Sequence, residues 1–191
     1  MTMPPTAEKN PVSQTRSRLV LLLIAAMFLS SFGIAAFLRF SGWQPAHSKN
    51  FGELLQPPRD LGGQHLLRAD GQPYEWNPQA NTWRIVAVPA ADCERACVAM
   101  IDTLRRIWET EGRQADRVDV LWFGPVPAGA PSFRRFVPMQ PNAALAAALP
   151  EAASRDALPV YLIDPSGFLV MRYRAGFAPA DLHKDLGKLI K

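Results

Sequence analysis

Two cysteines, Cys93 and Cys97, are the only thiols of this 191-residue chain, and they stand four positions apart. They follow a short apolar run at residues 83–88 and open a stretch with the periodicity of a helix. A pair so placed can form a disulfide, cycle between the disulfide and the dithiol, or bind a soft metal ion. A purely structural bridge is the weakest explanation, because closing so short a loop removes little entropy from the unfolded chain.

The two thiols are expected to play different parts. Cys97 shares an apolar helical stripe with Ile101 and Leu104, which makes it the buried, resolving thiol. Cys93 should be the exposed nucleophile, since the N-terminus of a helix favours a thiolate. Positions i and i+4 of a helix are near the upper limit for a disulfide, so Cys93 is expected outside the regular helix. Asp92 is placed to cap that helix.

The surrounding sequence alternates between strand and helix patterns. Strands are expected at 83–88, 118–123, 160–163 and 168–173, and helices at 93–111, 142–149 and 179–190. A turn at 164–167 predicts that the last two strands pair antiparallel, and a hairpin-like stretch at 65–76 opens the domain. This element order predicts an α/β fold of the thioredoxin-like type, a mixed sheet flanked by helices.

Pro159 stands directly before the third expected core strand. In thioredoxin folds a cis-proline typically occupies this junction beside the thiols, so we expect a cis Leu158–Pro159 bond and assign Pro159 to the site with Cys93 and Cys97. The ordinary alternative is a proline that starts a strand, where it removes no interior hydrogen bond of the ladder.

Residues 19–38 form 20 consecutive positions without a charge, the length that a helix needs to cross roughly 30 Å of hydrocarbon. A cleaved signal peptide is the competing interpretation, although its apolar core is usually only about 7–15 residues long. Arg16 and Arg18 precede the run and only Arg39 follows closely, so the N-terminus is expected in the cytoplasm. Both interpretations deliver residues 40–191 to the periplasmic side of a bacterial-type inner membrane.

The expected organisation therefore has four parts: a disordered cytoplasmic tail at 1–18, a transmembrane helix at 19–38, a periplasmic tether at 39–60 and a thioredoxin-like domain at 61–191. From residue 40 onward there are 17 basic and 16 acidic side chains, so nothing concentrates positive charge for nucleic acid. The sequence also has no Gly-rich phosphate loop, and its three histidines are too dispersed for a Ser-His-Asp grouping or a histidine metal cluster. These observations argue against nucleotide enzymes and hydrolases.

Residues 50–191 resemble the Sco/SenC group of membrane-anchored thioredoxin-fold proteins, and most of all its shorter cytochrome oxidase associated relatives. The matching segments are NFGELL at 50–55, DCERAC at 92–97, YLIDPSG at 161–167 and DLGKL at 185–189. The Cys-x-x-x-Cys spacing is the most specific of them. The resemblance implies a role in cytochrome c oxidase assembly, with an oxidase subunit or its assembly factors as partners. Such a protein either hands copper to the binuclear copper site or keeps the cysteines of that site reduced.

This sequence departs from the family pattern at one position. Copper-binding members carry a histidine in the loop before the strand at 160–163, and residues 154–159 (SRDALP) contain none. Two thiolates can still bind Cu(I), whose softness matches sulfur, so Cys93 and Cys97 stay a tentative Cu(I) site.

A replacement for the missing ligand is not evident in the sequence. His183 lies on the last helix, His65 in the opening hairpin and His47 in the tether, while Met100 shares the helical face of Cys97 but is ordinary core filler. Thiol–disulfide exchange is therefore the leading hypothesis, ahead of Cu(I) delivery. A non-catalytic assembly partner is the third.

Overall fold

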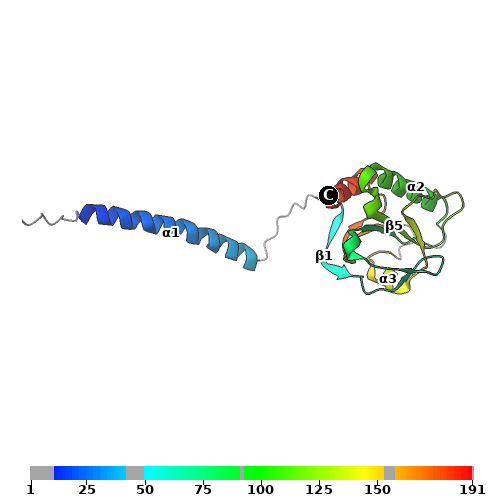
Figure 1. Cartoon of the computed structure of the whole chain (residues 1–191), viewed down its shortest axis with the longest axis horizontal. Helices are drawn as coiled ribbons and strands as arrows, with labels where there is room; N and C mark the ends of the chain where they lie inside the picture. The colour runs from blue at the N-terminus through cyan, green and yellow to red at the C-terminus, as the bar shows by residue number, and fades with distance from the viewer. Residues whose placement is uncertain (1–10, 42–49, 91–92, 153–157, 191) are drawn as a thin grey trace, which may run out of the picture. The chain divides into compact units, whose positions relative to one another are not determined.

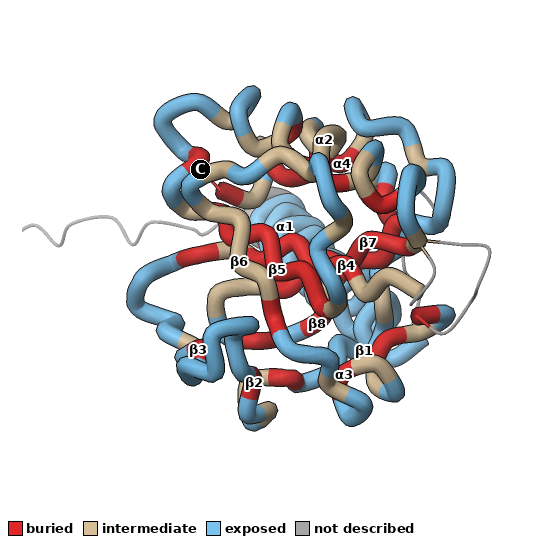
Figure 2. Tube along the Cα trace, turned by 90° about the vertical axis from the view of Figure 1, so that its right-hand side faces the viewer, coloured by how far each residue is buried: buried red, intermediate tan, exposed pale blue. Residues whose placement is uncertain are grey.

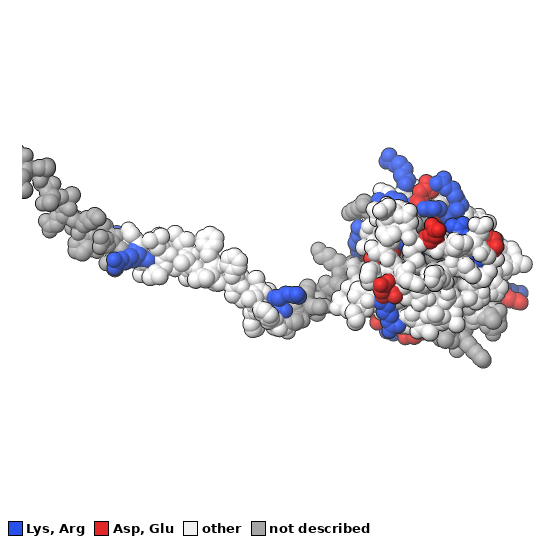
Figure 3. Space-filling model, turned by 60° about the horizontal axis from the view of Figure 1, so that its bottom comes forward, with Lys and Arg blue, Asp and Glu red and all other residues white. Residues whose placement is uncertain are grey.

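The computed structural model describes residues 11–41, 50–90, 93–152 and 158–190, and it divides the chain into two compact units, 1–48 and 49–191. The described part of the first unit is one helix, α1 (Pro11–Phe40) (Figure 1). Its segment Arg16–Phe40 is long and apolar enough to cross a membrane, by length and composition. In Figure 3 its charged side chains lie only toward its two ends.

Helix α1 begins earlier than the apolar run. The disordered tail expected over residues 1–18 is wrong for 11–18, which are helical, while residues 1–10 lie outside the described part of the chain. Proline suits the first position of a helix, and no helix-breaking residue stands between Pro11 and the apolar run. Extending a helix that already exists is far easier than starting one, so the polar residues continue it.

The second unit contains a six-stranded mixed sheet with the strand order β1-β8-β7-β4-β5-β6 (Figure 1). The strands are β1 (Glu53–Asp60), β4 (Trp83–Ala87), β5 (Val118–Phe123), β6 (Phe136–Met139), β7 (Val160–Ile163) and β8 (Phe168–Tyr173). Strands β4, β5 and β6 are parallel, and β7, β8 and β1 follow antiparallel on the other side of β4. A separate hairpin joins β2 (Leu66–Leu67) to β3 (Pro73–Tyr74).

The helices of this unit are α2 (Arg95–Thr110), α3 (Ala143–Ala148) and α4 (Pro179–Leu189), with short 3-10 turns η1 (Pro78–Ala80) and η2 (Gly112–Arg117). The four expected strands, three expected helices and opening hairpin are therefore confirmed, with small shifts at their ends. So is the antiparallel pairing of the last two strands. The result is the expected thioredoxin-like mixed sheet with helices on both faces.

Alternation along the strands divides the core into two layers. In β5, Val120 and Trp122 pack with α2 and α4, whereas Leu121 and Phe123 pack with α3 and the hairpin. Figure 2 shows the result, a buried sheet between more exposed outer segments. The apolar stripe of α2 covers one face of the sheet. Because α2 follows β4, its N-terminus lies on the side of the carboxyl ends of the parallel strands.

Both edge strands were absent from our expectations. We assigned residues 39–60 to a tether, but residues 53–60 are β1, which pairs with β8. The sequence of β1 contains two prolines and shows no alternating burial, and β6 contains Pro138. Proline is tolerated at the edge of a sheet because one side of the strand needs no partner, so tertiary pairing makes these strands where local pattern does not indicate them.

A buried polar network fastens the opening hairpin to the sheet. The Tyr74 hydroxyl donates to Asp119 Oδ2 at 2.7 Å and accepts from Arg84 Nε at 2.9 Å, and the Arg84 side chain is almost fully buried. Burial, followed by the charge of Asp119, raises the pKa of Tyr74 above its ordinary range. The hydroxyl therefore stays protonated and links a buried carboxylate to a buried guanidinium.

Replacing Tyr74 by Phe should lower the free energy of unfolding by about 1–3 kcal/mol, because both charged partners lose a hydrogen bond in a buried place. Urea unfolding of the wild type and the Tyr74→Phe variant measures the difference. A Tyr74→Phe variant as stable as the wild type would show that the network contributes nothing to the attachment of the hairpin.

Candidate functional site

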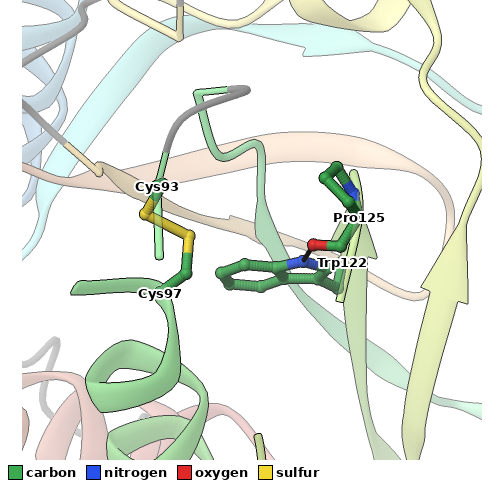
Figure 4. Close-up of a disulfide and its surroundings, with 4 residues drawn as sticks. All are labelled: Cys93, Cys97, Trp122 and Pro125. Carbon is green, nitrogen blue, oxygen red and sulfur yellow. Dashed lines mark hydrogen bonds between the residues drawn. A yellow bond between two sulfur atoms is a disulfide. The ribbon is translucent and has the colours of Figure 1, made fainter. Parts of the chain in front are cut away.

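Cys93 and Cys97 are joined by a disulfide with a Cα–Cα distance of 5.4 Å (Figure 4). Cys93 lies in the connection between β4 and α2, and its N–H donates to the carbonyl of Ala90 at 3.3 Å. Cys97 lies in the first turn of α2, which begins at Arg95. Cys93 is therefore outside the regular helix, as the short spacing requires.

Among the described residues, the N-cap side chain of α2 does not cap the helix next to the disulfide. Glu94 occupies the N-cap position of α2 and makes no capping hydrogen bond. Asp92, which we expected to cap the helix, lies outside the described residues. The N–H groups of the first helical turn and the helix dipole favour negative charge on a sulfur that lies at this end.

The two sulfurs differ in exposure. Cys97 is 1% exposed within the apolar cluster between the sheet and α2, whereas Cys93 is half-buried at the rim of that cluster. An incoming thiol or thiolate therefore has access to Cys93 before Cys97. The low-polarity surroundings of Cys97 disfavour a charged thiolate on that residue.

The indole of Trp122 packs beside the disulfide. Figure 4 shows its indole next to Cys97, and its Nε1–H donates to the carbonyl of Pro125 at 3.1 Å. The ring is fully buried, so it fixes both the packing around Cys97 and the start of the connection after β5. This connection touches the one after β4, since a Cβ on Gly124 would lie 2.8 Å from the Pro89 ring. Trp122 and Pro125 were not among the expected site residues, because a tryptophan in a buried strand is typical of an ordinary core.

Pro159 is buried directly before β7, whose first residue Val160 pairs with Ala87 at the end of β4. It therefore lies at the end of the sheet from which the cysteine connection starts, and neighbouring Leu158 packs against the same apolar cluster as Cys93. The expected cis bond is wrong, because among the described residues the cis peptide bond is Gln56–Pro57. An X–Pro bond prefers trans by about 0.5–1 kcal/mol, and a proline at the first position before a strand meets no constraint against it.

The histidines weighed as metal ligands lie away from the disulfide. His183 Nδ1 is 2.7 Å from Glu111 Oε1, next to the last turn of α2, which is about 21 Å along the helix from Cys97. His65 lies by the hairpin, on the other face of the sheet, and its carbonyl accepts from Asn142. His47 lies outside the described residues.

Among the described residues, Met100 brings a third sulfur near the disulfide. Met100 is half-buried one turn beyond Cys97 and packs against the same cluster as both cysteines. Within the described residues no group of three or more His, Cys, Asp or Glu side chains could hold a metal ion. Two thiolates and a thioether suit Cu(I) and suit a harder ion poorly.

A second buried polar centre joins the first residues of the domain to its last helix. The Asp185 carboxylate is fully buried and accepts from the N–H groups of Phe51 (2.7 Å) and Gly52 (2.9 Å). It also accepts from the Tyr173 hydroxyl (3.0 Å) and Lys188 Nζ (2.9 Å). We did not expect this arrangement, although an acidic residue beside the inward-facing Leu182 and Leu186 was a usable signal.

Comparison with known families finds one match. The family model described as "Transmembrane-like, thioredoxin-like, C-terminal domain" matches residues 83–191, which include the disulfide, Pro159 and Asp185. No curated protein matches the sequence.

Several solved structures are similar. BsSco, described as a member of the Sco family of cytochrome c oxidase assembly proteins with a disulfide switch, is 13% identical, with 76% of this chain and 98% of that chain covered and a TM-score of 0.50. A SCO1/SenC family lipoprotein from Bacillus anthracis str. Ames is 13% identical over 72% of this chain and 99% of that chain, with a TM-score of 0.49. GPX1 from T. cruzi is 20% identical over 69% and 97%, also with a TM-score of 0.49. At these identities the likeness to BsSco shows a shared fold.

Proposed function

Because the chain belongs to the transmembrane-like, thioredoxin-like C-terminal domain family, we propose that it is a membrane-anchored thiol–disulfide exchange protein that assists cytochrome c oxidase assembly. The observation that carries the proposal is the Cys93–Cys97 disulfide at a strand-to-helix junction, with Cys93 half-buried and Cys97 fully buried. A purely structural bridge does not need a partly exposed cysteine directly before the N-terminus of a helix.

In the reaction, the thiolate of reduced Cys93 attacks one sulfur of a partner disulfide. A mixed disulfide forms and the first partner thiolate leaves. The thiolate of Cys97 then attacks the Cys93 sulfur, which closes the internal disulfide and releases the second partner thiolate. The partner gains two electrons and takes up two protons, and the protein loses them. The same steps run in reverse when the partner is the reductant.

We assign the catalytic roles accordingly: Cys93 is the nucleophile, Cys97 resolves the mixed disulfide, and Pro159 shapes the surface beside them. Arg95, exposed directly after the N-cap, adds a positive charge near Cys93. Trp122 is a positioning residue, since it packs against Cys97 and does not reach the surface.

Helix α1 supplies the anchor in this proposal, with residues 19–38 in the hydrocarbon of a bacterial inner membrane. The basic residues before them hold the N-terminus in the cytoplasm and place the domain in the periplasm. That compartment allows disulfides to persist, in agreement with the oxidised pair. The partner is then an oxidase subunit or an assembly factor with an exposed cysteine pair, in keeping with the description of BsSco as an oxidase assembly protein.

Copper delivery is the second candidate, and Met100 is the observation that favours it. After reduction, Cys93, Cys97 and Met100 would present three sulfurs to Cu(I) on one side of α2. Cu(I) would be cargo that passes to the oxidase. The described residues offer no histidine at this place, so exchange chemistry remains the better-supported function.

Restoration of oxidase assembly in a strain that lacks the gene tests the proposal. A Cys93→Ser/Cys97→Ser variant should restore cytochrome c oxidase activity to less than about one tenth of the wild-type level, because both mechanisms need the sulfurs. An Ala99→Ser/Thr110→Ser variant, which alters two exposed positions of the same helix, should restore it fully. Full restoration by the double cysteine variant would instead support the non-catalytic assembly partner and end the proposal.

A further inference from the structure

Phe51 is the most exposed large hydrophobic side chain among the described residues 50–190. It is 55% exposed, and Leu54, three residues later, is 39% exposed. Phe40 is the last residue of α1, and Asn50, directly before Phe51, follows it by ten positions. The apolar exposure of the domain is thus greatest where the chain arrives from the anchor.

The backbone of Phe51 is held rigidly although its ring is exposed. The N–H groups of Phe51 and Gly52 both donate to the buried Asp185 carboxylate. Gly52 also has no room for a side chain, since a Cβ there would lie 2.6 Å from the Tyr173 ring. An exposed aromatic ring on a fixed backbone loses little conformational entropy when a partner covers it.

Two lysines of α4 lie on the ring of Phe51. The Nζ atoms of Lys184 and Lys188 are 4.8 Å and 5.3 Å from the ring centroid, and Lys188 is also paired with Asp185. The chain contains five lysines, at positions 9, 49, 184, 188 and 191. No lysine therefore occurs between residues 50 and 183, whereas arginines occur throughout the domain. Aromatic rings such as Phe bury in the headgroup region of a bilayer, and lysines beside them are attracted to anionic lipids.

We propose that Phe51, Lys184 and Lys188 form a docking surface for the anionic headgroups of the bilayer that holds α1. The ring enters the headgroup region, and the two lysines bind lipid phosphates on either side of it. Ten steps of chain reach at most about 36 Å, so the anchor keeps this surface at a high local concentration next to the bilayer and weak individual contacts suffice. Docking fixes the orientation in which the disulfide meets a membrane-bound partner.

The inference rests on the proposed anchorage through α1. The test uses the full chain in nanodiscs of phosphatidylcholine alone and of equal parts phosphatidylcholine and phosphatidylglycerol, each with a trace of lipid that carries a chelated gadolinium ion at its headgroup. Gadolinium broadens the amide signals of residues near the headgroups. In the anionic discs, the signals of Gly52 and Lys184 should broaden more than that of Leu67, an exposed apolar residue on the hairpin at the other face of the sheet.

Charge and apolar contact can be removed separately. Lys184→Gln/Lys188→Gln should lower the ratio of docked to undocked domain about 25-fold in the anionic discs, and Phe51→Ser about tenfold. The control Arg68→Gln/Arg113→Gln removes two exposed charges elsewhere and should leave the ratio unchanged. Broadening is compared between residues of the same variant, in one spectrum. The same spectrum verifies that the variant is folded.

Three results would overturn the inference. Equal broadening of Gly52 and Leu67 in anionic discs shows that the domain has no preferred face, and equal broadening in both lipid mixtures shows that anionic lipid is not the partner. An unchanged ratio in both the lysine and the Phe51 variants assigns docking to other residues. If the chain does not insert into the discs at all, the proposed anchorage fails, and the proposed function fails with it. This result differs from the three above, in which the chain inserts but its domain does not dock as proposed.

Discussion

A Cys97→Ser variant is expected to accumulate a mixed disulfide between Cys93 and its partner. The buried Cys97 is the residue that would resolve this intermediate, and serine cannot attack a sulfur. Cys93→Ser should not trap a partner, and its exchange rate should fall by on the order of 10³ or more, because the remaining thiol is buried. Non-reducing gels of cell membranes followed by mass spectrometry measure the trapped species, and exchange with a small disulfide measures the rate.

The roles of the two thiols are tested by the difference between the two variants. Trapping by Cys93→Ser and not by Cys97→Ser would reverse the assignment. The absence of trapping in both, with normal oxidase assembly, would remove exchange chemistry altogether. Loss of the disulfide should not unfold either variant, since a bridge over so short a loop contributes about 2 kcal/mol or less to the free energy of unfolding.

Asp185→Ala should be the most destabilising single substitution that the structure indicates, with a loss of about 3–5 kcal/mol in the free energy of unfolding. The substitution removes the carboxylate that accepts from two backbone N–H groups, the Tyr173 hydroxyl and Lys188, and leaves those donors unpaired. Strand β1 should lose protection first, because its start depends on these bonds. Urea unfolding and hydrogen exchange of residues 50–60 measure both effects. Asp181→Ala, in the first turn of the same helix, is the control and should cost well under 1 kcal/mol.

The same carboxylate predicts how stability responds to acid. Burial raises the pKa of Asp185, but hydrogen bonds from Gly52, Lys188, Phe51 and Tyr173 lower it more, so the pKa lies below its ordinary value of 3.8. A lowered pKa in the folded state means that the stabilisation is complete above the unfolded value and is lost as the pH falls through the folded one. The advantage of the wild type over Asp185→Ala should therefore shrink between neutral pH and about pH 3. An advantage that stayed constant would mean that Asp185 has the same pKa in the folded and the unfolded state, and would contradict the lowered pKa.

Much of the fold could be predicted from local pattern. Residues 118–123, 160–163 and 168–173 are strands with the predicted ends, because continuous apolar runs with β-branched and aromatic residues between turn signals have few other stable arrangements. The placement of Cys93 and Cys97 between a strand and a helix followed from the same pattern. The spacing allowed their pairing on the condition that Cys93 lies outside the regular helix, which is where the structure has it.

The edges and the polar contacts depended on tertiary structure. Strand β1 exists because β8 offers it a free edge, and its own sequence, ELLQPPRD, indicates a loop. The bonds from Phe51 and Gly52 to Asp185 join residues more than 130 positions apart, and nothing local to either segment specifies them. The prediction of a cis Leu158–Pro159 bond was wrong for a similar reason, because small free-energy differences in the surroundings of an X–Pro bond decide its isomer.

The amino-acid sequence by itself thus determined the apolar anchor segment, the order of the core elements and the position of the two thiols, since each depends on periodicity or composition within a short window. Only the tertiary structure decided that Trp122 packs against the buried Cys97 and that Phe51 contacts Lys184 and Lys188. Those properties arise from contacts between distant segments, whose free energies appear only once the chain has closed around a common core.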